Sequence, residues 1–323
     1  MSIVRTVLGD IDAAALGVTY AHEHLVIDGG RPVELFPDFL LADTDRMAAE
    51  LARAAEAGLR SAIDAMPADC GRNPAKLAEL SRRTGVNIVA STGLHHERFY
   101  GPSHWSLRAS DDELADLFTA DVTDGIDERD YGGPIVRRTD VPAGIVKVAG
   151  SQGGPSGRDL PIFRAAAETH RRTGVPVHTH CEDGTGALEQ LCVLIDGGVP
   201  AASISMSHVD KVVDRGYHRE LLSTGCFAVY DQAFRWGDRD NGTVQLIEWA
   251  AADGTVSQVM LGMDAARQGY YRSYGGGPGL TYLLGEFSDL LGARGIARNV
   301  REALFTANPA RAFAFAEVTE VVG

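Results

Sequence analysis

Short apolar runs alternate with amphipathic stretches along almost the whole chain. Eight runs rich in β-branched and apolar residues are predicted strands, at residues 18–24, 61–65, 87–93, 144–148, 176–180, 203–208, 227–231 and 258–264. Residues 43–58, 73–84, 159–173 and 184–197 place apolar side chains at helical spacing between them. Strands that alternate with helices of this length predict parallel βαβ units.

Helix-end residues support this division. Asp43 is placed to cap the helix over 43–58, and Gly85, Gly174 and Gly198 follow helices at points where a left-handed residue is expected. Eight repeats favour a closed (β/α)8 barrel, the TIM-barrel form of the α/β class, over a doubly wound open sheet. The open sheet is the alternative, but it needs a glycine-rich phosphate turn after an early strand, which this sequence lacks.

No stretch rich in Gly, Ser or Pro is long enough to separate domains. We therefore predict one domain over residues 1–323, with residues 1–16 as a short segment that leads into the first strand. The longest irregular stretches are residues 94–110, 125–143 and 265–279. Each follows a strand or its helix, where we expect the active-site loops of a barrel.

Charge and composition narrow the possible partners. The formal net charge is −14 and no block of Lys or Arg occurs, which argues against nucleic acid and membrane surfaces. The four cysteines are too sparse for a disulfide framework, and we find neither a signal peptide nor an apolar run long enough to span a bilayer. We predict a cytoplasmic protein with a small-molecule substrate, and a homodimer stays open.

Six side chains with metal-binding chemistry lie at the carboxyl ends of five predicted strands: His22, His24, Lys147, His180, His208 and Asp264. Side chains two apart on a strand point to the same side, so one strand end can present two ligands. In a barrel the six would converge at the top. Imidazole and carboxylate groups suit zinc, manganese, cobalt or iron rather than calcium. A lysine inside an apolar strand is costly to bury and needs an explanation.

The segment from Thr6 to Gly9, followed by residues 17–24 (GVTYAHEH), resembles the N-terminal signature of the phosphotriesterase family in the amidohydrolase superfamily. Later segments resemble further blocks of that family, at residues 144–148, 174–180, 207–208 and 261–264. The resemblance runs from about Thr6 to Arg311 and implies a (β/α)8 barrel that carries two divalent metal ions and acts as a hydrolase.

The resemblance also implies a role for each ligand. Carried over, His22, His24 and Asp264 bind the buried ion, and His180 and His208 bind the more exposed one. The matching Lys147 is carbamylated and bridges both ions, which would explain its burial. Zinc is the first expectation, with manganese, cobalt or iron as alternatives. His178 competes with His180, since both lie on one strand face; the family pattern favours His180 and leaves His178 lining the barrel below it.

The implied reaction is hydrolysis by a hydroxide that bridges the two metal ions, with Asp264 taking its proton and delivering it to the leaving group. Arg267 and Tyr270 follow the last strand, and their spacing from Asp264 resembles the family branch that hydrolyses phosphorylated sugar lactones. We expect both to hold the phosphate, with Arg235 as a third contact, since guanidinium groups bind such anions well. The expected substrate is a small anionic lactone.

Three alternatives stay open: an organophosphate triesterase, a cyclic amide hydrolase with the same metal centre, and a non-catalytic binding protein on the same barrel. Phe99, Tyr100 and Trp105 could line the apolar pocket that a triesterase needs.

The remaining histidines fall into two groups. His170 and His218 lie in predicted helices and are expected to be solvated, whereas the loop over 94–110 could bring three others to the pocket: His95, His96 and His104.

Overall fold

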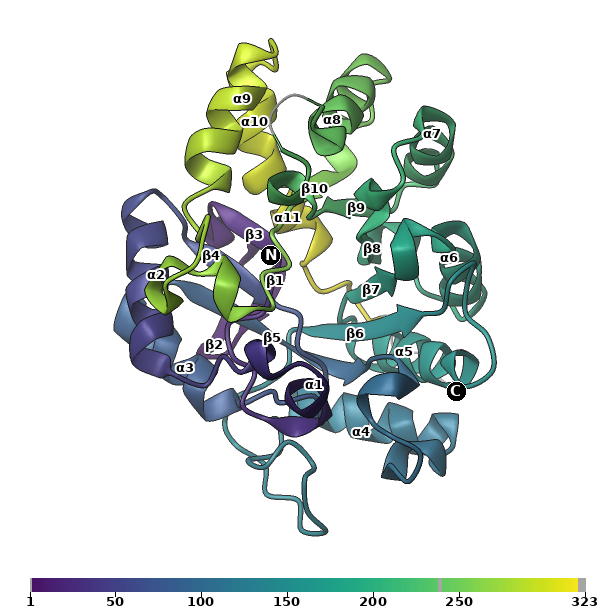
Figure 1. Cartoon of the computed structure of the whole chain (residues 1–323). Helices are drawn as coiled ribbons and strands as arrows, with labels where there is room; N and C mark the ends of the chain where they lie inside the picture. Colours follow the sequence, from purple (N-terminus) through teal and green to yellow (C-terminus); the bar gives the residue numbers. More distant parts are fainter. Residues whose placement is uncertain (1, 238–239, 319–323) are drawn as a thin grey trace.

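The computed structural model describes residues 2–237 and 240–318. Eight parallel strands lie side by side in chain order, as Figure 1 shows. They are β3 (Thr19–Glu23), β4 (Ser61–Asp64), β5 (Asn87–Leu94), β6 (Ile145–Gly150), β7 (Val177–Cys181), β8 (Ile204–Ser207), β9 (Phe227–Tyr230) and β10 (Val259–Leu261). All eight predicted strands are therefore confirmed, and their bounds move by at most a few residues.

The ring of strands closes between its first and last members. The backbone N–H groups of Met263 and Asp264, just after β10, donate to the carbonyl of His22 in β3 at 3.2 and 2.9 Å. This closure confirms the (β/α)8 barrel and excludes the open sheet. It also brings the residue after β10 beside the metal-ligand candidates of β3.

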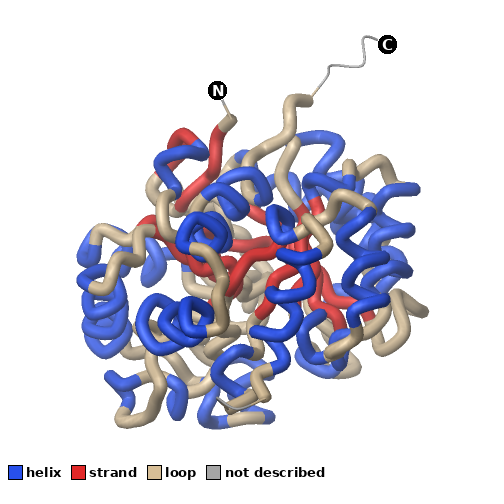
Figure 2. The backbone as a smooth tube through the Cα atoms, turned by 90° about the horizontal axis from the view of Figure 1, so that it is seen from above, coloured by secondary structure: helices blue, strands red, loops and turns tan. Residues whose placement is uncertain are grey.

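Helices surround the strands, as the view from above shows (Figure 2). They are α1 (Gly30–Leu35), α2 (Thr44–Glu56), α3 (Pro74–Thr84), α4 (Asp111–Thr123), α5 (Asp159–Thr173), α6 (Ala187–Asp196), α7 (Arg215–Ser223), α8 (Gly242–Ala252), α9 (Ser288–Ala293), α10 (Arg298–Phe305) and α11 (Ala307–Ala312). Asp43 caps α2 by accepting from the N–H of Arg46. Gly85, Gly174 and Gly198 have φ values of 70°, 75° and 95°, as their predicted positions require. No helix in residues 2–237 and 240–318 is long and apolar enough to cross a membrane.

The chain begins with a hairpin that its apolar pattern does not predict. β1 (Ile3–Thr6) pairs antiparallel with β2 (Gly9–Asp12), where only a leading segment was predicted. These strands have four residues each, and β2 contains no buried residue, so the apolar pattern is too weak to detect. Val4 of β1 is buried with Phe313 near the C-terminal end of the described chain, and both belong to the cluster that includes Ile145 of the barrel.

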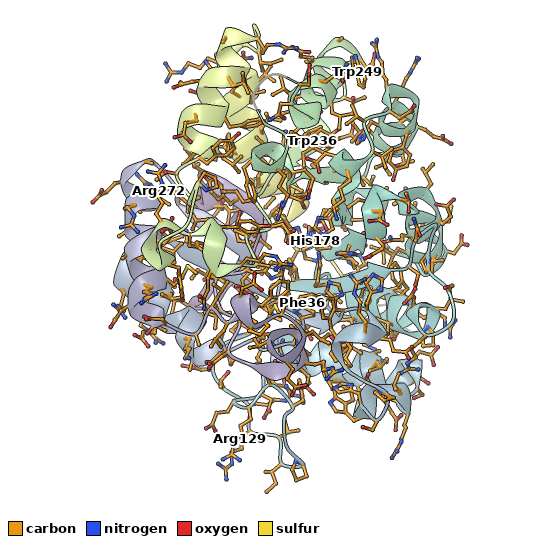
Figure 3. The ribbon with its side chains drawn as sticks, viewed as in Figure 1. Phe36, Arg129, His178, Trp236, Trp249 and Arg272 are labelled. Carbon is orange, nitrogen blue, oxygen red and sulfur yellow. The ribbon has the colours of Figure 1, made fainter. Side chains whose placement is uncertain are left out.

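The barrel interior is packed, and its upper layer is polar. Ile145 lies two residues before Lys147 on β6 and belongs to a compact apolar cluster that includes residues from several other strands. His178 of β7 lies near the centre of the barrel in Figure 3 and is fully buried. Its Nδ1 lies 2.8 Å from Ser205 Oγ, and its ring lies edge-on to His22 with centroids 5.0 Å apart.

The three long irregular stretches have different places. Residues 94–110 and 265–279 follow β5 and β10 at the carboxyl end of the barrel. Residues 125–143 instead follow α4 and run beside the barrel as a long loop, visible at the edge of Figure 1. That loop lines a separate groove together with His104 and Trp105, so the expectation that it forms part of the main pocket is wrong.

Candidate metal centre

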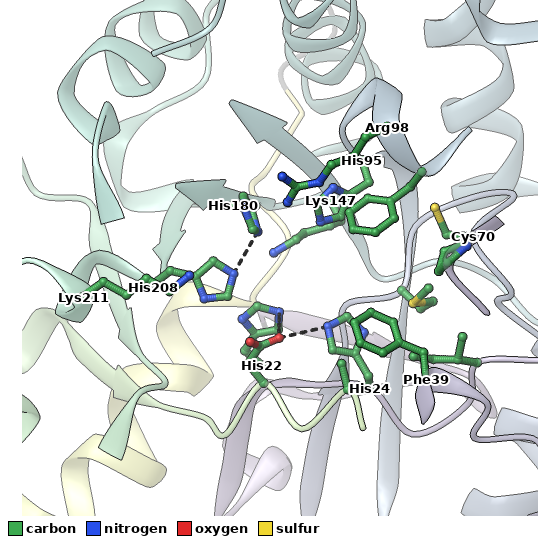
Figure 4. Close-up of a pocket in the computed structure, with 16 residues that line it drawn as sticks. His22, His24, Phe39, Cys70, His95, Arg98, Lys147, His180, His208 and Lys211 are labelled. Atoms are coloured by element: carbon green, nitrogen blue, oxygen red, sulfur yellow. Dashed lines mark hydrogen bonds and ion pairs between the residues drawn. The ribbon is translucent and has the colours of Figure 1, made fainter. Parts of the chain in front are cut away.

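A cavity of about 180 Å³ opens at the carboxyl end of the barrel, drawn in Figure 4. All six predicted ligand side chains line it: His22, His24, Lys147, His180, His208 and Asp264. Three of them lie on β3, β6 and β7, and the other three, His24, His208 and Asp264, lie one to three residues beyond the ends of β3, β8 and β10. Because parallel strands end at the same edge, barrel closure alone is enough to gather these groups.

The first group of donor atoms comes from β3 and the loop after β10. Nε2 of His24 lies 3.2 Å from Asp264 Oδ1, and Nε2 of His22 lies 3.6 Å from the same oxygen. Burial, and then the charge of Lys147, hold the pKa of His22 well below its usual value, so this imidazole is neutral and can act as a ligand. Burial would raise the pKa of Asp264, but neighbouring His208 and the hydrogen bond from His24 lower it well below the usual range.

The second group joins β7 to the end of β8. Nδ1 of His180 lies 2.9 Å from Nε2 of His208, the contact marked by a dashed line in Figure 4. Burial, and then the neighbouring His208, keep the pKa of His180 well below its usual value. Two imidazole nitrogens therefore face each other with little room between them, as two ligands of one ion would.

Asp231 holds both groups in place, and the sequence analysis gave it no role. Its Oδ2 lies 2.9 Å from His22 Nδ1 and its Oδ1 lies 2.9 Å from His208 Nδ1. The carboxylate is fully buried, and although burial raises its pKa, the charge and hydrogen bond of His208 bring that pKa below the usual value. A hydrogen bond at Nδ1 fixes the tautomer of each ring and leaves Nε2 free to bind. Its place at the end of a predicted strand was the signal that could have revealed it.

Lys147 lies in the upper layer of the barrel and is 1% exposed. Its Nζ lies 3.2 Å from Ser207 Oγ. Burial lowers the pKa of Lys147 to about 7, so a substantial fraction of the amine is uncharged at neutral pH. Gly93 of the adjacent strand allows a close approach here, because a Cβ at that position would meet the Lys147 carbonyl oxygen at 2.0 Å.

Two of the candidate ligands have an unusual backbone conformation. His208 has φ 67° and Asp264 has φ 49°, in the left-handed region that favours glycine. His208 directly follows β8 and Asp264 lies three residues after the end of β10, and at both places the turn brings the side chain into the cavity lining. Left-handed backbone at residues other than glycine is commonly found at functional sites, where the surrounding structure maintains it.

A carboxylate that the sequence analysis missed contacts His180 from outside the cavity. Glu182 Oε2 lies 2.7 Å from His180 Nε2 and 3.1 Å from His96 Nε2. Arg98 makes a bidentate ion pair with the same carboxylate at 3.0 and 3.2 Å. Hydrogen bonds from His180, then His96, hold the pKa of Glu182 well below its usual value.

The three predicted substrate contacts lie outside the lining of this cavity. Arg235 donates to the backbone carbonyls of Asp231 and Asp264 and lies 3.3 Å from Asp264 Oδ2, so it holds the metal-ligand loop. Arg267 is paired with Asp38 at 2.6 Å. The ring of Tyr270 packs edge-on against Phe234 and beside the Arg235 guanidinium.

Two other cations line the cavity, and the sequence analysis named neither as a substrate contact. They are Arg98, after β5, and Lys211, in the short turn (Val209–Lys211) after His208. Arg98 is paired with Glu182, whereas the Lys211 ammonium makes no ion pair or hydrogen bond within the described chain. Among the described residues that line the cavity, Lys211 is therefore a cation without a charged partner.

Loop 94–110 reaches the cavity with only some of the residues expected there. His95 and Phe99 line it, as the sequence allowed, whereas Tyr100 does not. His104 and Trp105 lie in the separate groove, where both bind the Asp69 carboxylate at 2.8 and 2.9 Å.

His170 and His218 are buried, so the expectation that both are solvated is wrong. Nδ1 of His170 bonds the carbonyl of Val175 at 2.8 Å. His218 lies between the carbonyl of Val212 and the hydroxyl of Tyr230, at 2.9 Å from each. Both imidazole rings are buried, and nitrogen atoms of each form hydrogen bonds with nearby groups, as is usual for buried polar atoms.

The donor set fits divalent metal ions. Nitrogen and carboxylate oxygen atoms converge in two adjacent groups. Three of the imidazoles, those of His22, His180 and His208, have a carboxylate partner at the opposite ring nitrogen. Histidine and aspartate of this kind are ligands for zinc and its neighbours in the first transition row. The described residues can thus hold metal at the barrel mouth.

A sequence model of the phosphotriesterase family matches residues 2–313. The chain belongs to the phosphotriesterase family. It is 32% identical to a phospho-furanose lactonase of Mycoplasmopsis synoviae (strain 53), over 97% of this chain and 92% of that protein. The comparison confirms the resemblance recognised in the sequence, and the protein is a hydrolase of this family.

Two solved structures agree with this fold. A lactonase from Listeria monocytogenes superposes with a TM-score of 0.90 at 28% identity, covering 98% of this chain and 100% of its own. The phosphotriesterase homology protein of Escherichia coli, solved with phosphate in its active site, gives 0.84 at 28% identity over 93% and 99%.

Proposed function

We propose that this protein is a binuclear metal-dependent lactonase that acts on a small phosphorylated sugar lactone. One observation carries the proposal: six ligand side chains line a single small cavity that also has an unpaired lysine at its mouth. The similarity to a phospho-furanose lactonase supports the substrate class. We keep zinc as the first candidate metal and the cytoplasm as the location.

The proposed ligand groups follow from the donor atoms. His22, His24 and Asp264 would hold one ion, and His180 and His208 the other. When bound, the two ions would lower the pKa of water and polarise the carbonyl of the substrate. Asp231 orients His22 and His208, so that both present Nε2.

Lys147 is suited to form the bridging carbamate. Its uncharged amine, available because burial lowers its pKa to about 7, can attack carbon dioxide with its lone pair. A nitrogen–carbon bond forms while one carbon–oxygen π bond of carbon dioxide opens onto oxygen, the nitrogen releases one proton to solvent, and the neutral amine becomes an anionic carbamate with oxygen ligand atoms. This modification would remove the conflict between an ammonium group and two nearby cations.

Asp264 is the candidate proton carrier. Its Oδ1 faces His22 and His24, whereas Oδ2 lies 3.3 Å from Arg235. A carboxylate with its pKa far below neutral is ionised and ready to accept a proton from the attacking water and pass it to the leaving alkoxide.

Anion recognition is proposed at the rim. Lys211 is free to bind a phosphate as it stands, whereas Arg267 must first exchange its partner Asp38. Arg235 and Tyr270 are better placed to support the Asp264 loop than to reach into the cavity. We retain Arg267, Tyr270 and Arg235 as proposed phosphate contacts and add Lys211 to them.

A second candidate is an organophosphate triesterase. The cavity lining includes four large apolar residues, Ile27, Phe39, Met66 and Phe99, and such side chains would suit a hydrophobic leaving group. A relative from Saccharolobus solfataricus, 26% identical over 94% of this chain, bears the name aryldialkylphosphatase.

The test uses metal-loaded protein and pairs of five-carbon lactones with and without phosphate. We expect kcat/KM to be at least tenfold higher for the phosphorylated member, because one charge-assisted contact contributes about 1.5–3 kcal/mol. Equal rates on both members would remove the anion requirement but leave the lactonase. Hydrolysis of paraoxon or of a cyclic amide without any lactone turnover would favour the alternatives.

A further inference from the structure

We propose that Glu182 is a positioning residue for the more exposed metal ion, acting through His180. The inference deepens the proposed function and rests on its metal centre. Glu182 lies outside the cavity lining and contacts the ligand set through the imidazole of His180, whose Nε2 is 2.7 Å from its Oε2. The opposite nitrogen, Nδ1, is the one that faces His208.

This contact selects a tautomer. A carboxylate at Nε2 requires the proton of the neutral ring to be there, because an ionised carboxylate can only accept hydrogen bonds. The lone pair of His180 is then on Nδ1, toward His208, where the proposed ion would bind. The carboxylate also makes the ring a stronger electron donor, as it does for other metal-bound histidines.

Asp231 gives the arrangement an internal parallel. It bonds Nδ1 of both His22 and His208 and leaves Nε2 of each facing the site. Glu182 does the same for His180 with the two ring nitrogens exchanged. Three of the four candidate imidazole ligands thus have a carboxylate behind them.

Glu182 is itself fixed by the loop that follows β5. His96 lies 3.1 Å from Oε2, and Arg98 contacts both oxygens. The guanidinium beside the carboxylate disfavours a third cation among His96, His180 and Glu182, although their donor atoms lie close enough together for one. The carboxylate is therefore better understood as an orienting group than as a ligand.

This arrangement connects loop 94–110 to the proposed site of the more exposed metal ion. Arg98 lines the cavity with one face and binds Glu182 with its guanidinium. A movement of loop 94–110 would shift His180 through two successive contacts, from Arg98 to Glu182 at 3.2 Å and from Glu182 to His180 at 2.7 Å. His96 of the same loop makes a parallel link, because its Nε2 lies 3.1 Å from the same Glu182 oxygen.

The test compares Glu182→Gln and Glu182→Ala with wild type. Glu97→Gln is the matched control, because Glu97 is an exposed carboxylate of loop 94–110 and has no ion pair within the described chain. Zinc affinity is measured by competition with a chromogenic chelator, and melting temperature by circular dichroism. We expect one of two zinc ions to bind 10- to 100-fold more weakly in Glu182→Gln, and more weakly still in Glu182→Ala. The other ion and Glu97→Gln should stay within twofold of wild type.

A second readout does not depend on turnover. In cobalt-loaded protein, the visible absorption of the more weakly bound ion should change in Glu182→Gln and remain as in wild type in Glu97→Gln. If zinc affinity and the cobalt spectrum are unchanged in both Glu182 variants, the inference is overturned, whatever their melting temperatures. The proposed function survives that result as long as wild type binds two ions. A wild type that binds fewer than two ions would overturn both.

Discussion

Nε2 of His208 lies 2.9 Å from Nδ1 of His180, and the opposite nitrogen of each ring contacts a carboxylate. With protons on the carboxylate sides, two lone pairs point at one another. A metal cation that accepts both lone pairs would stabilise such an arrangement. The pair therefore has the character of a metal site that is organised by its supporting hydrogen bonds.

We expect wild type grown with zinc and bicarbonate to hold two metal ions per chain, and Lys147→Ala to lose most of them. The reason is that a bridging anion would disappear from between two cations. Elemental analysis of both proteins measures the loss. A short carboxylic acid in the buffer should restore part of the activity of the variant. A fully metal-loaded Lys147→Ala protein would contradict the bridging role.

Asp231→Asn should weaken metal binding by about 10- to 100-fold, the range typical for loss of a carboxylate behind a metal-bound histidine. Asp231 contacts two candidate ligands at once, at 2.9 Å each. Chelator competition gives the affinity, with Asp196→Asn, at an exposed position at the end of α6, as the control for loss of one negative charge. Equal affinity in both variants would argue against the orienting role of Asp231.

Asp264→Asn should lower kcat by about 10²-fold or more and change KM less, because the loss of a positioned proton acceptor acts on the chemical step. Metal content must be measured on the same sample, since Asp264 is also a proposed ligand. Near-normal kcat in a metal-replete variant would remove Asp264 from proton transfer.

Lys211→Gln should raise KM for a phosphorylated lactone by about 10- to 100-fold and leave an uncharged lactone almost unaffected. Arg267→Gln should have a smaller effect, because Asp38 already neutralises that guanidinium. Steady-state kinetics with the two substrates separates anion binding from a folding defect, which would weaken turnover of both. A larger effect at Arg267 would make it the principal phosphate contact.

Stability should fall as the pH drops below about 6.5, the ordinary pKa of histidine. Burial lowers the pKa of His218, so the unfolded chain binds a proton that the folded chain resists. Stability from this group is present above the unfolded pKa and is lost toward the lower folded pKa, by at most about 1.4 kcal/mol per pH unit. Urea unfolding at pH 7.5 and 5.5 should show a smaller difference in His218→Gln, and an identical difference would contradict this account.

The sequence predicts the barrel well because its signals are local. Each strand is a short apolar run between turn residues, and the candidate ligands lie at the run ends, so parallel pairing alone gathers residues as distant as His22 and Asp264. The supporting contacts depend on distances that no local pattern contains. The pairing of Arg267 with Asp38, 229 residues away, is one such contact. The hydrogen bond that Glu182 accepts from His180 is another. Its effect on the metal centre depends on which ring nitrogen of His180 faces His208, and the sequence does not contain that information.

The left-handed backbone at His208 and Asp264 has a consequence for directed evolution. At both sites glycine or asparagine would suit the φ angle better than the residue present. A library selected only for thermal tolerance would be expected to enrich glycine or asparagine there and to discard the metal centre in the process. A library for a more thermostable variant should therefore keep His208 and Asp264 unchanged and place its substitutions elsewhere, for instance on the exposed helix surfaces.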